Sequence, residues 1–186
     1  MYLVKRIDQE IEKRSLLKHP FYQMWSEGKL DLEALQGYAK EYFHLVKAVP
    51  SMVEKLATHD SNENIRTNLQ EEREHIEPWI KFAGAVGVSR KELEEYEVAE
   101  KTRDSVNRLL ELASVFDEGV AAMYAYEAEI PKISQTKLEG LAKYYDITSN
   151  DATEYQRIHA TVDVKHAAVW RNILEQLPNN RTIRFG

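Results

Sequence analysis

The sequence contains no cysteine, which excludes disulfide bonds, thiolate metal ligands and a cysteine nucleophile. Any metal ion bound by this chain must therefore take nitrogen and oxygen ligands. Glycine and proline are also scarce, with seven and five among 186 residues, so few positions favour turns or interrupt helices. Long helices are expected, and no repeat or internal low-complexity linker divides the chain.

Long apolar runs and an excess of basic residues are missing as well. No stretch approaches the roughly 18 to 20 apolar residues that cross a bilayer, and the opening MYLVKRIDQEIEKR lacks a signal-peptide core. The formal net charge of −6 argues against nucleic acid and anionic membranes, because both attract clustered positive charge. We therefore expect a cytoplasmic protein with neither nucleic acid nor membrane as its partner.

Apolar residues recur at three- and four-residue spacing, as in Leu35, Tyr38, Tyr42 and Leu45, which is typical of amphipathic helices. No strand pattern competes with it. We predict an all-α, single-domain bundle of about seven helices over residues 1–178, followed by a polar tail over residues 179–186. The predicted helices cover residues 3–18, 31–59 with a bend near Pro50, 62–86, 89–96, 101–130, 132–146 and 150–177.

Short motifs indicate where some helices begin and end. Ser89 and Glu92 have the spacing of a capping box. Gly28 is expected to close a loop formed by HPFYQMWSEGK, and Pro131 interrupts an otherwise helical pattern.

The segment IHATVDVKHAAVW places His159, Asp163 and His166 at positions i, i+4 and i+7. On one helix they would project within about 60° of one another, at roughly 100° per residue. Two imidazoles and a carboxylate that face one point match the ligands of iron, manganese or zinc. The same spacing also occurs among solvated residues, so this segment alone does not establish a metal site.

A second segment, NLQEEREHIEPWIKF, gives Glu72 and His75 the Glu-x-x-His spacing by which one helix directs two ligands inward. Glu71 is an alternative ligand, four residues before His75. Taken alone, these residues also fit a charged helix surface. Because Ile76 and Trp79 mark the apolar side of the same helix, His75 is expected at the border of the core.

Glu127 lies within the apolar segment GVAAMYAYEAEIPKI, where burying a carboxylate costs on the order of several kcal/mol unless it is paired or metal-bound. A buried salt bridge is the alternative explanation, and Glu129 is expected to face solvent. Together the three segments approach the ligand inventory of di-iron carboxylate bundles. We predict two metal ions, Fe/Fe or Mn/Fe, although the ligands would also accept zinc. The predicted ligands are Glu72, His75, Glu127, His159, Asp163 and His166.

These segments resemble those of the haem-oxygenase-like di-iron oxygenases, a branch of the wider TenA- and PqqC-like group. The resemblance covers nearly the whole chain, from LLKHPFYQMWSEGKL through the three ligand segments to SQTKLEGL and HATVDVKHA. It implies a haem-oxygenase-like helical bundle and a metal-dependent oxygenase that uses dioxygen and an external reductant. It also implies a homodimer.

Within this branch the pattern is most similar to enzymes that make para-aminobenzoate for folate synthesis from their own side chains. The resemblance implies that Tyr22 in HPFY supplies the ring and that Lys137 in SQTKLEGL supplies the amino group. Tyr126 and Tyr155 match two further active-site tyrosines. One departure is the short spacing from Glu72 to His75: these relatives have a longer looped spacing, whereas one unbroken helix is expected here.

Three other functions stay open on the sequence. The metals could oxidise an external amine, fatty acid or amino acid, which would make Lys137 incidental. A metal-free TenA- or PqqC-like enzyme is a second alternative, although the missing cysteine disfavours the usual thiaminase nucleophile. A helical interaction module without catalysis is the third.

Overall fold

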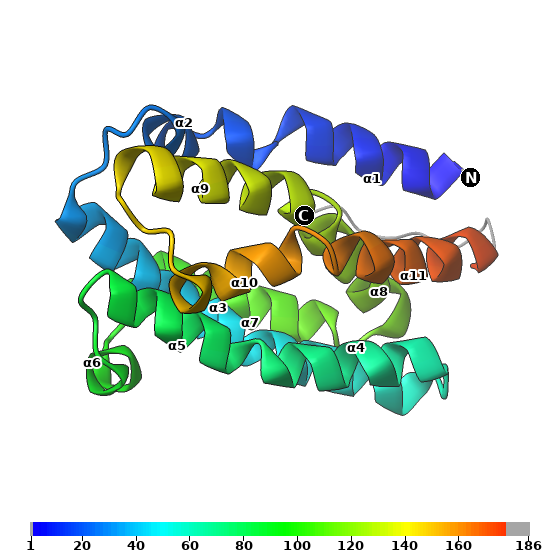
Figure 1. The fold of residues 1–186 in the computed structure, drawn as a ribbon. Helices are drawn as coiled ribbons and strands as arrows, with labels where there is room; N and C mark the ends of the chain where they lie inside the picture. Colours follow the sequence, from blue (N-terminus) through cyan, green and yellow to red (C-terminus); the bar gives the residue numbers. More distant parts are fainter. Residues whose placement is uncertain (1, 178–186) are drawn as a thin grey trace.

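The computed structural model describes residues 2–177, and every regular element among them is a helix (Figure 1). The predicted all-α fold is confirmed, whereas the predicted tail over residues 179–186 lies outside the described residues. The elements are α1 (Tyr2–Lys13), the 3-10 helix η1 (Leu16–Lys18), α2 (Pro20–Ser26), α3 (Leu32–His59), α4 (Glu63–Glu74), α5 (Ile76–Ala85), α6 (Arg90–Glu95), α7 (Glu100–Leu112), α8 (Phe116–Glu127), α9 (Ile130–Tyr144), α10 (Asn150–His159) and α11 (Asp163–Gln176).

The helices are arranged in three layers (Figure 1). Helices α1, α2 and α9 lie on one side, α8, α10 and α11 in the middle, and α3, α4, α5 and α7 on the other side. The middle layer contacts both others: α10 packs on α5 and α9, and α11 packs on α8, α1 and α4. Side chains of the middle layer therefore reach the centre of the molecule.

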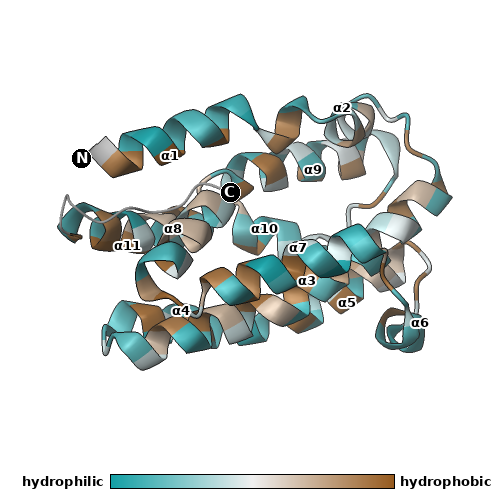
Figure 2. Ribbon diagram, turned by 180° about the vertical axis from the view of Figure 1, so that it is seen from behind, coloured by the Kyte–Doolittle hydropathy of each residue, from teal (hydrophilic) through white to brown (hydrophobic). Residues whose placement is uncertain are grey.

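Hydrophobic and hydrophilic residues alternate around most of the helices, as expected for amphipathic helices (Figure 2). Their apolar sides form two clusters of buried residues, one containing Trp170 and the other Trp25 and Trp79. All three tryptophans have 0% exposed surface, so each anchors a core. No helix between residues 2 and 177 combines the length and apolarity needed to span a membrane.

The prediction of one continuous helix over residues 62–86 was wrong. The helix is interrupted at His75, between α4 and α5. Pro78 explains the break, because proline has no backbone N–H to donate to the carbonyl of Glu74 and its ring clashes with that carbonyl. The break leaves Glu72 at the end of one helix and His75 at the junction.

Two other predicted helices are also divided within residues 2–177. The predicted helix 101–130 is interrupted at residues 113–115, and the predicted helix 150–177 at residues 160–162. At the first interruption, Gly119 of α8 packs against the end of α7, and a Cβ atom at Gly119 would lie 2.8 Å from the backbone of Ala113. The turn before α8 thus packs too closely for a straight helix.

The segment predicted as a loop between the first two helices contains α2. His19 caps this helix by accepting a hydrogen bond from the Phe21 N–H at 3.2 Å, and Pro20 occupies the first helical position. Gly28 has a positive φ of 66° and follows the helix, as its predicted place in the turn requires. The Ser89–Glu92 capping box is confirmed, and Pro131 lies in the first turn of α9.

Candidate metal centre

Six buried ionisable side chains meet in the centre of the bundle. They come from the α4–α5 junction, the end of α8, the end of α10 and the start of α11. None exceeds 5% exposure, so the molecule buries three carboxyl groups and three imidazoles in one region. They are the six side chains predicted as ligands: Glu72, His75, Glu127, His159, Asp163 and His166.

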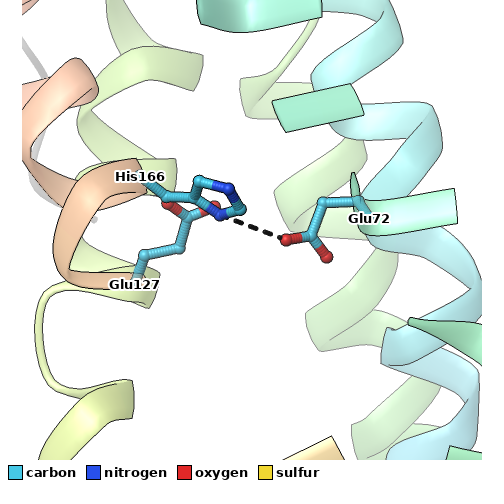
Figure 3. A group of neighbouring side chains, drawn as sticks. All are labelled: Glu72, Glu127 and His166. Atoms are coloured by element: carbon cyan, nitrogen blue, oxygen red, sulfur yellow. Dashed lines mark ion pairs between the residues drawn. The ribbon is translucent and has the colours of Figure 1, made fainter. Parts of the chain in front are cut away.

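Three of these side chains form a compact group that could bind a metal ion. One ligand atom each of Glu72, Glu127 and His166 lies within 4.8 Å of the other two. Figure 3 shows the Glu127 carboxylate and the His166 ring close together and the Glu72 carboxylate directed toward them. Donors at roughly 2.0 to 2.2 Å from one ion lie up to about 4.4 Å apart, so only a small closure of this group would be needed.

The other three side chains adjoin this group. The His159 Nδ1 atom lies 2.9 Å from an Asp163 oxygen, and the His75 and His159 rings are 4.5 Å apart. Asp163 connects the two halves, because its other oxygen lies 3.6 Å from His166 Nδ1. The arrangement thus places further nitrogen and oxygen donors beside the compact group.

Four of the six side chains carry a buried polar atom that makes no hydrogen bond within residues 2–177. These atoms are His75 Nδ1, Glu127 Oε1, His159 Nε2 and His166 Nδ1. An unsatisfied buried polar atom costs about 1 to 3 kcal/mol, and four in one place are rare in a folded protein. The residues therefore fit metal ions, which would satisfy the free oxygen and nitrogen atoms together.

Charge within the cluster is unevenly distributed. Burial, together with the nearby Glu72 and Asp163, raises the pKa of Glu127 well above its usual value. Burial acts in the same direction on Glu72, but the nearby imidazoles of His166 and His75 outweigh it and lower its pKa to about 2. The pKa values of these two neighbouring carboxyl groups are thus shifted in opposite directions, and a metal ion would compete with the proton for Glu127.

The geometry favours Glu72 over Glu71 as a ligand. The Glu71 side chain is 41% exposed and its carboxylate contacts His166 Nε2 at 2.5 Å, on the side away from the compact group. Glu72 is buried and faces His166 Nδ1 at 3.5 Å. Glu71 therefore occupies the position of an outer partner that would orient the imidazole of a candidate ligand.

The predicted pair Tyr22 and Lys137 also comes together. Both side chains are buried, on α2 and α9, and the Lys137 Nζ atom lies 5.7 Å from the centroid of the Tyr22 ring. Burial lowers the pKa of Lys137 to about 7 and raises that of Tyr22 to about 12. Near neutral pH the amine is therefore partly uncharged and the phenol protonated.

A tight contact between α2 and α9 fixes this pair. The Trp25 ring N–H donates to the backbone carbonyl of Lys137 at 3.2 Å. One turn further along α9, a Cβ atom at Gly140 would lie 2.6 Å from the Trp25 ring, so only glycine allows this approach. Trp25 lies one turn after Tyr22, and its docking thus places Tyr22 beside Lys137.

Tyrosines connect the pair to the candidate metal centre. The hydroxyl groups of Tyr42 and Tyr126 are 3.0 Å apart, and Tyr126 immediately precedes Glu127. The Tyr155 ring packs against the His159 ring with centroids 4.1 Å apart. Tyr126 and Tyr155, both predicted as active-site tyrosines, therefore lie next to candidate ligands.

Two residues that belong to the site were not predicted as such. The Trp170 ring N–H donates to Glu127 at 2.7 Å. Trp170 follows His166 by four residues, a spacing that places both side chains on the same face of a helix and could have indicated that Trp170 lies at the site. Tyr38 accepts a hydrogen bond from Lys137 at 2.5 Å, although its sequence pattern indicated only core packing.

Glu129, expected to face solvent, is half-buried and accepts hydrogen bonds from the Ser15 hydroxyl and the Leu16 N–H.

Fold and site together define an all-helical protein with a buried group of carboxylates and imidazoles that could bind metal. The sequence pattern of the TENA/THI-4/PQQC family matches residues 7–177. The chain belongs to this family.

Relatives and solved structures agree with that assignment. A 4-aminobenzoate synthase of Chlamydia pneumoniae is 34% identical over 184 residues, covering 94% of this chain and 82% of the relative. One of Nitrosomonas europaea is 31% identical, covering 92% and 78%. Among solved structures, a TenA homologue from Pseudomonas syringae has a TM-score of 0.83 at 17% identity, covering 96% of this chain and 81% of that one. The last comparison supports the fold alone.

Proposed function

We propose that this protein is a metal-dependent oxygenase that makes para-aminobenzoate from its own Tyr22, with the amino group supplied by Lys137. The single observation that supports it best is the burial of Lys137 beside Tyr22, 5.7 Å from its ring, in a bundle that also buries a carboxylate and histidine cluster. Para-aminobenzoate is the same compound as 4-aminobenzoate, which the names of the relatives describe as their product.

The ligand cluster would hold two metal ions, Fe/Fe or Mn/Fe, through Glu72, His75, Glu127, His159, Asp163 and His166. When bound, such ions supply the reduction of dioxygen and hence the oxidising power for Tyr22. The chain itself places the phenol and the amine together, excludes water from both, and keeps the amine partly neutral. An external reductant completes the reaction.

The test is anaerobic loading of the purified protein with ferrous iron and a reductant, followed by exposure to air. We expect para-aminobenzoate in an amount not exceeding one molecule per chain, because Tyr22 is consumed. Chromatography of the released small molecules measures the product, and elemental analysis measures the metal. Full metal loading without any product would contradict the proposal.

Lys137 gives this reaction a defined pH dependence. A nitrogen atom must carry a free electron pair to bond to carbon, and burial sets the pKa of Lys137 at about 7. Product formation is therefore expected to be low at acidic pH, to rise through about pH 7 and to level off above it. The measurement is single-turnover product formation across a pH series, and modification of Tyr22 mapped in the same samples is the control. A profile that is flat through pH 7 would contradict the role of the amine.

A second candidate function is oxidation of an external apolar molecule at the same metal centre. A pocket of about 440 Å³ between α1, α7, α8 and α9 favours it, because the pocket is lined mainly by apolar side chains and reaches Tyr126. Tyr126 in turn precedes Glu127 of the metal cluster. Repeated turnover of an added fatty acid or amine by protein with intact Tyr22 would distinguish this function from the first.

A further inference from the structure

Among residues 2–177, the Lys137 amine has one close polar neighbour. Its Nζ atom donates to the Tyr38 hydroxyl at 2.5 Å and otherwise lies over aromatic rings, 5.1 Å from the centroids of both Tyr38 and Tyr42. Burial alone shifts its pKa, with no contribution from a carboxylate. The direction of the amine is therefore set by Tyr38.

Tyr38 is itself held on several sides. Its ring contacts Phe21 and Trp25 at centroid distances of 5.1 and 5.6 Å, and Tyr42 and Trp79 at 5.5 and 5.6 Å. These rings come from α2, α3 and α5, so the hydroxyl has little freedom to move. A group fixed in this way can hold a flexible lysine in one position.

The Lys137 amine that Tyr38 holds also lies beside the second reacting side chain, 5.7 Å from the centroid of the Tyr22 ring. Burial raises the pKa of both phenols, and the two phenols lie close enough for each to affect the pKa of the other. Tyr38 therefore accepts from Lys137 while the Lys137 amine lies over Tyr22, which brings the amine, the phenol and the Tyr38 hydroxyl together.

We propose that Tyr38 is the positioning residue that holds the Lys137 amine against the Tyr22 ring. The inference rests on the proposed function, since it assigns a role within the transfer of nitrogen to Tyr22. Without the Tyr38 hydroxyl the amine can rotate among the surrounding rings. Misplacing a reacting group by about 1 Å can lower a rate about 100-fold, so we expect para-aminobenzoate to fall by about 10-fold or more.

The test is Tyr38→Phe, which removes the hydroxyl and keeps the ring. Tyr145→Phe is the matched control, because the Tyr145 ring also packs on Trp25, at 5.9 Å, and its hydroxyl accepts only a long hydrogen bond from the Leu30 N–H at 3.4 Å. Peptide mapping after iron loading and air exposure measures the loss of Tyr22 and the change at Lys137 separately. We expect Tyr38→Phe to lose Tyr22 without a matching change at Lys137, whereas the wild type and Tyr145→Phe change both together.

A parallel fall at both residues would mean a general structural defect and would overturn the inference, as would unchanged product or the same uncoupling in Tyr145→Phe. A second measurement separates the inference from the proposed function. In the metal-free protein, side-chain nitrogen NMR of isotopically labelled lysine should show a moved Lys137 resonance in Tyr38→Phe and an unmoved one in Tyr145→Phe. An unmoved resonance in both variants would refute the contact, whereas wild-type protein that makes no product would refute the proposed function.

Discussion

Replacing Tyr22 by phenylalanine is expected to abolish para-aminobenzoate formation while leaving metal binding intact. Tyr22→Phe keeps the aromatic ring, whose edge packs against Phe21 with centroids 5.4 Å apart, so α2 should stay docked. It removes the hydroxyl that makes the ring readily oxidisable. If Tyr22 is the source of the ring, no amount of iron, reductant or oxygen restores the product.

The result separates the two candidate functions. If the metals oxidise an external molecule and Tyr22 only packs, Tyr22→Phe should retain repeated turnover. Tyr144→Phe is the control for general loss of a tyrosine hydroxyl, because Tyr144 is 41% exposed and its ring contacts Tyr145 instead of Tyr22. Chromatography of the product and elemental analysis of both variants provide the comparison. Wild-type product yield from Tyr22→Phe would rule out self-sacrifice at this residue.

Glu127→Gln is expected to weaken metal binding strongly and, in the metal-free protein, to increase the free energy of unfolding. The first effect follows because the amide offers a poorer ligand than a carboxylate within the Glu72 and His166 group. The second follows because the variant removes a buried acid and keeps an oxygen that can accept from Trp170. A gain of about 1 to 3 kcal/mol is the size expected for such a burial penalty.

The sign of the pH dependence follows from the raised pKa of Glu127. Above the usual carboxyl pKa the unfolded chain ionises while the folded protein stays protonated, so wild-type stability falls as pH rises toward the folded value. The glutamine variant does not titrate, and its advantage should therefore be absent in acid and grow with pH.

Urea unfolding across pH, with elemental analysis after iron loading, tests both effects of Glu127→Gln. Glu118→Gln on the same helix is the control, because Glu118 lies outside the compact group and should change neither. Full metal retention by Glu127→Gln would contradict the assignment of Glu127 as a ligand.

The sequence was sufficient to identify the six clustered side chains, because residues three or four positions apart stay close in space even where the helix between them is interrupted. His159 and Asp163 are four residues apart and still meet at 2.9 Å, although a break separates α10 from α11. Glu127 could be found because a carboxylate in an apolar helix needs a partner. Their role as metal ligands stays a prediction.

The helix breaks at His75 and at residues 160–162 were not predicted, and several candidate ligands lie at helix ends. His75 lies at a junction, Glu127 and His159 end their helices, and Asp163 begins one. Pro78 carries a local signal for the break at His75, and Pro131 carries one for the end of α8. The others depend on packing between distant helices, as at Gly119, which no periodic pattern encodes.

The contact between Lys137 and Tyr38 was beyond sequence reasoning for a related reason. The two residues are 99 positions apart and belong to α9 and α3. A lysine in KLEGLAKYY has the pattern of a solvated residue, and Tyr38 has that of a core residue. Their meeting depends on Trp25 docking against Gly140, a tertiary contact.

Isotope tracing is the most direct test of the proposed self-sacrifice. Protein made with ring-labelled tyrosine and with lysine labelled at its side-chain nitrogen is loaded with iron and exposed to air among unlabelled free amino acids. The proposed function predicts that para-aminobenzoate carries both the ring label and the nitrogen label, as measured by mass spectrometry. Unlabelled para-aminobenzoate would show that the ring and the amino group come from outside the chain.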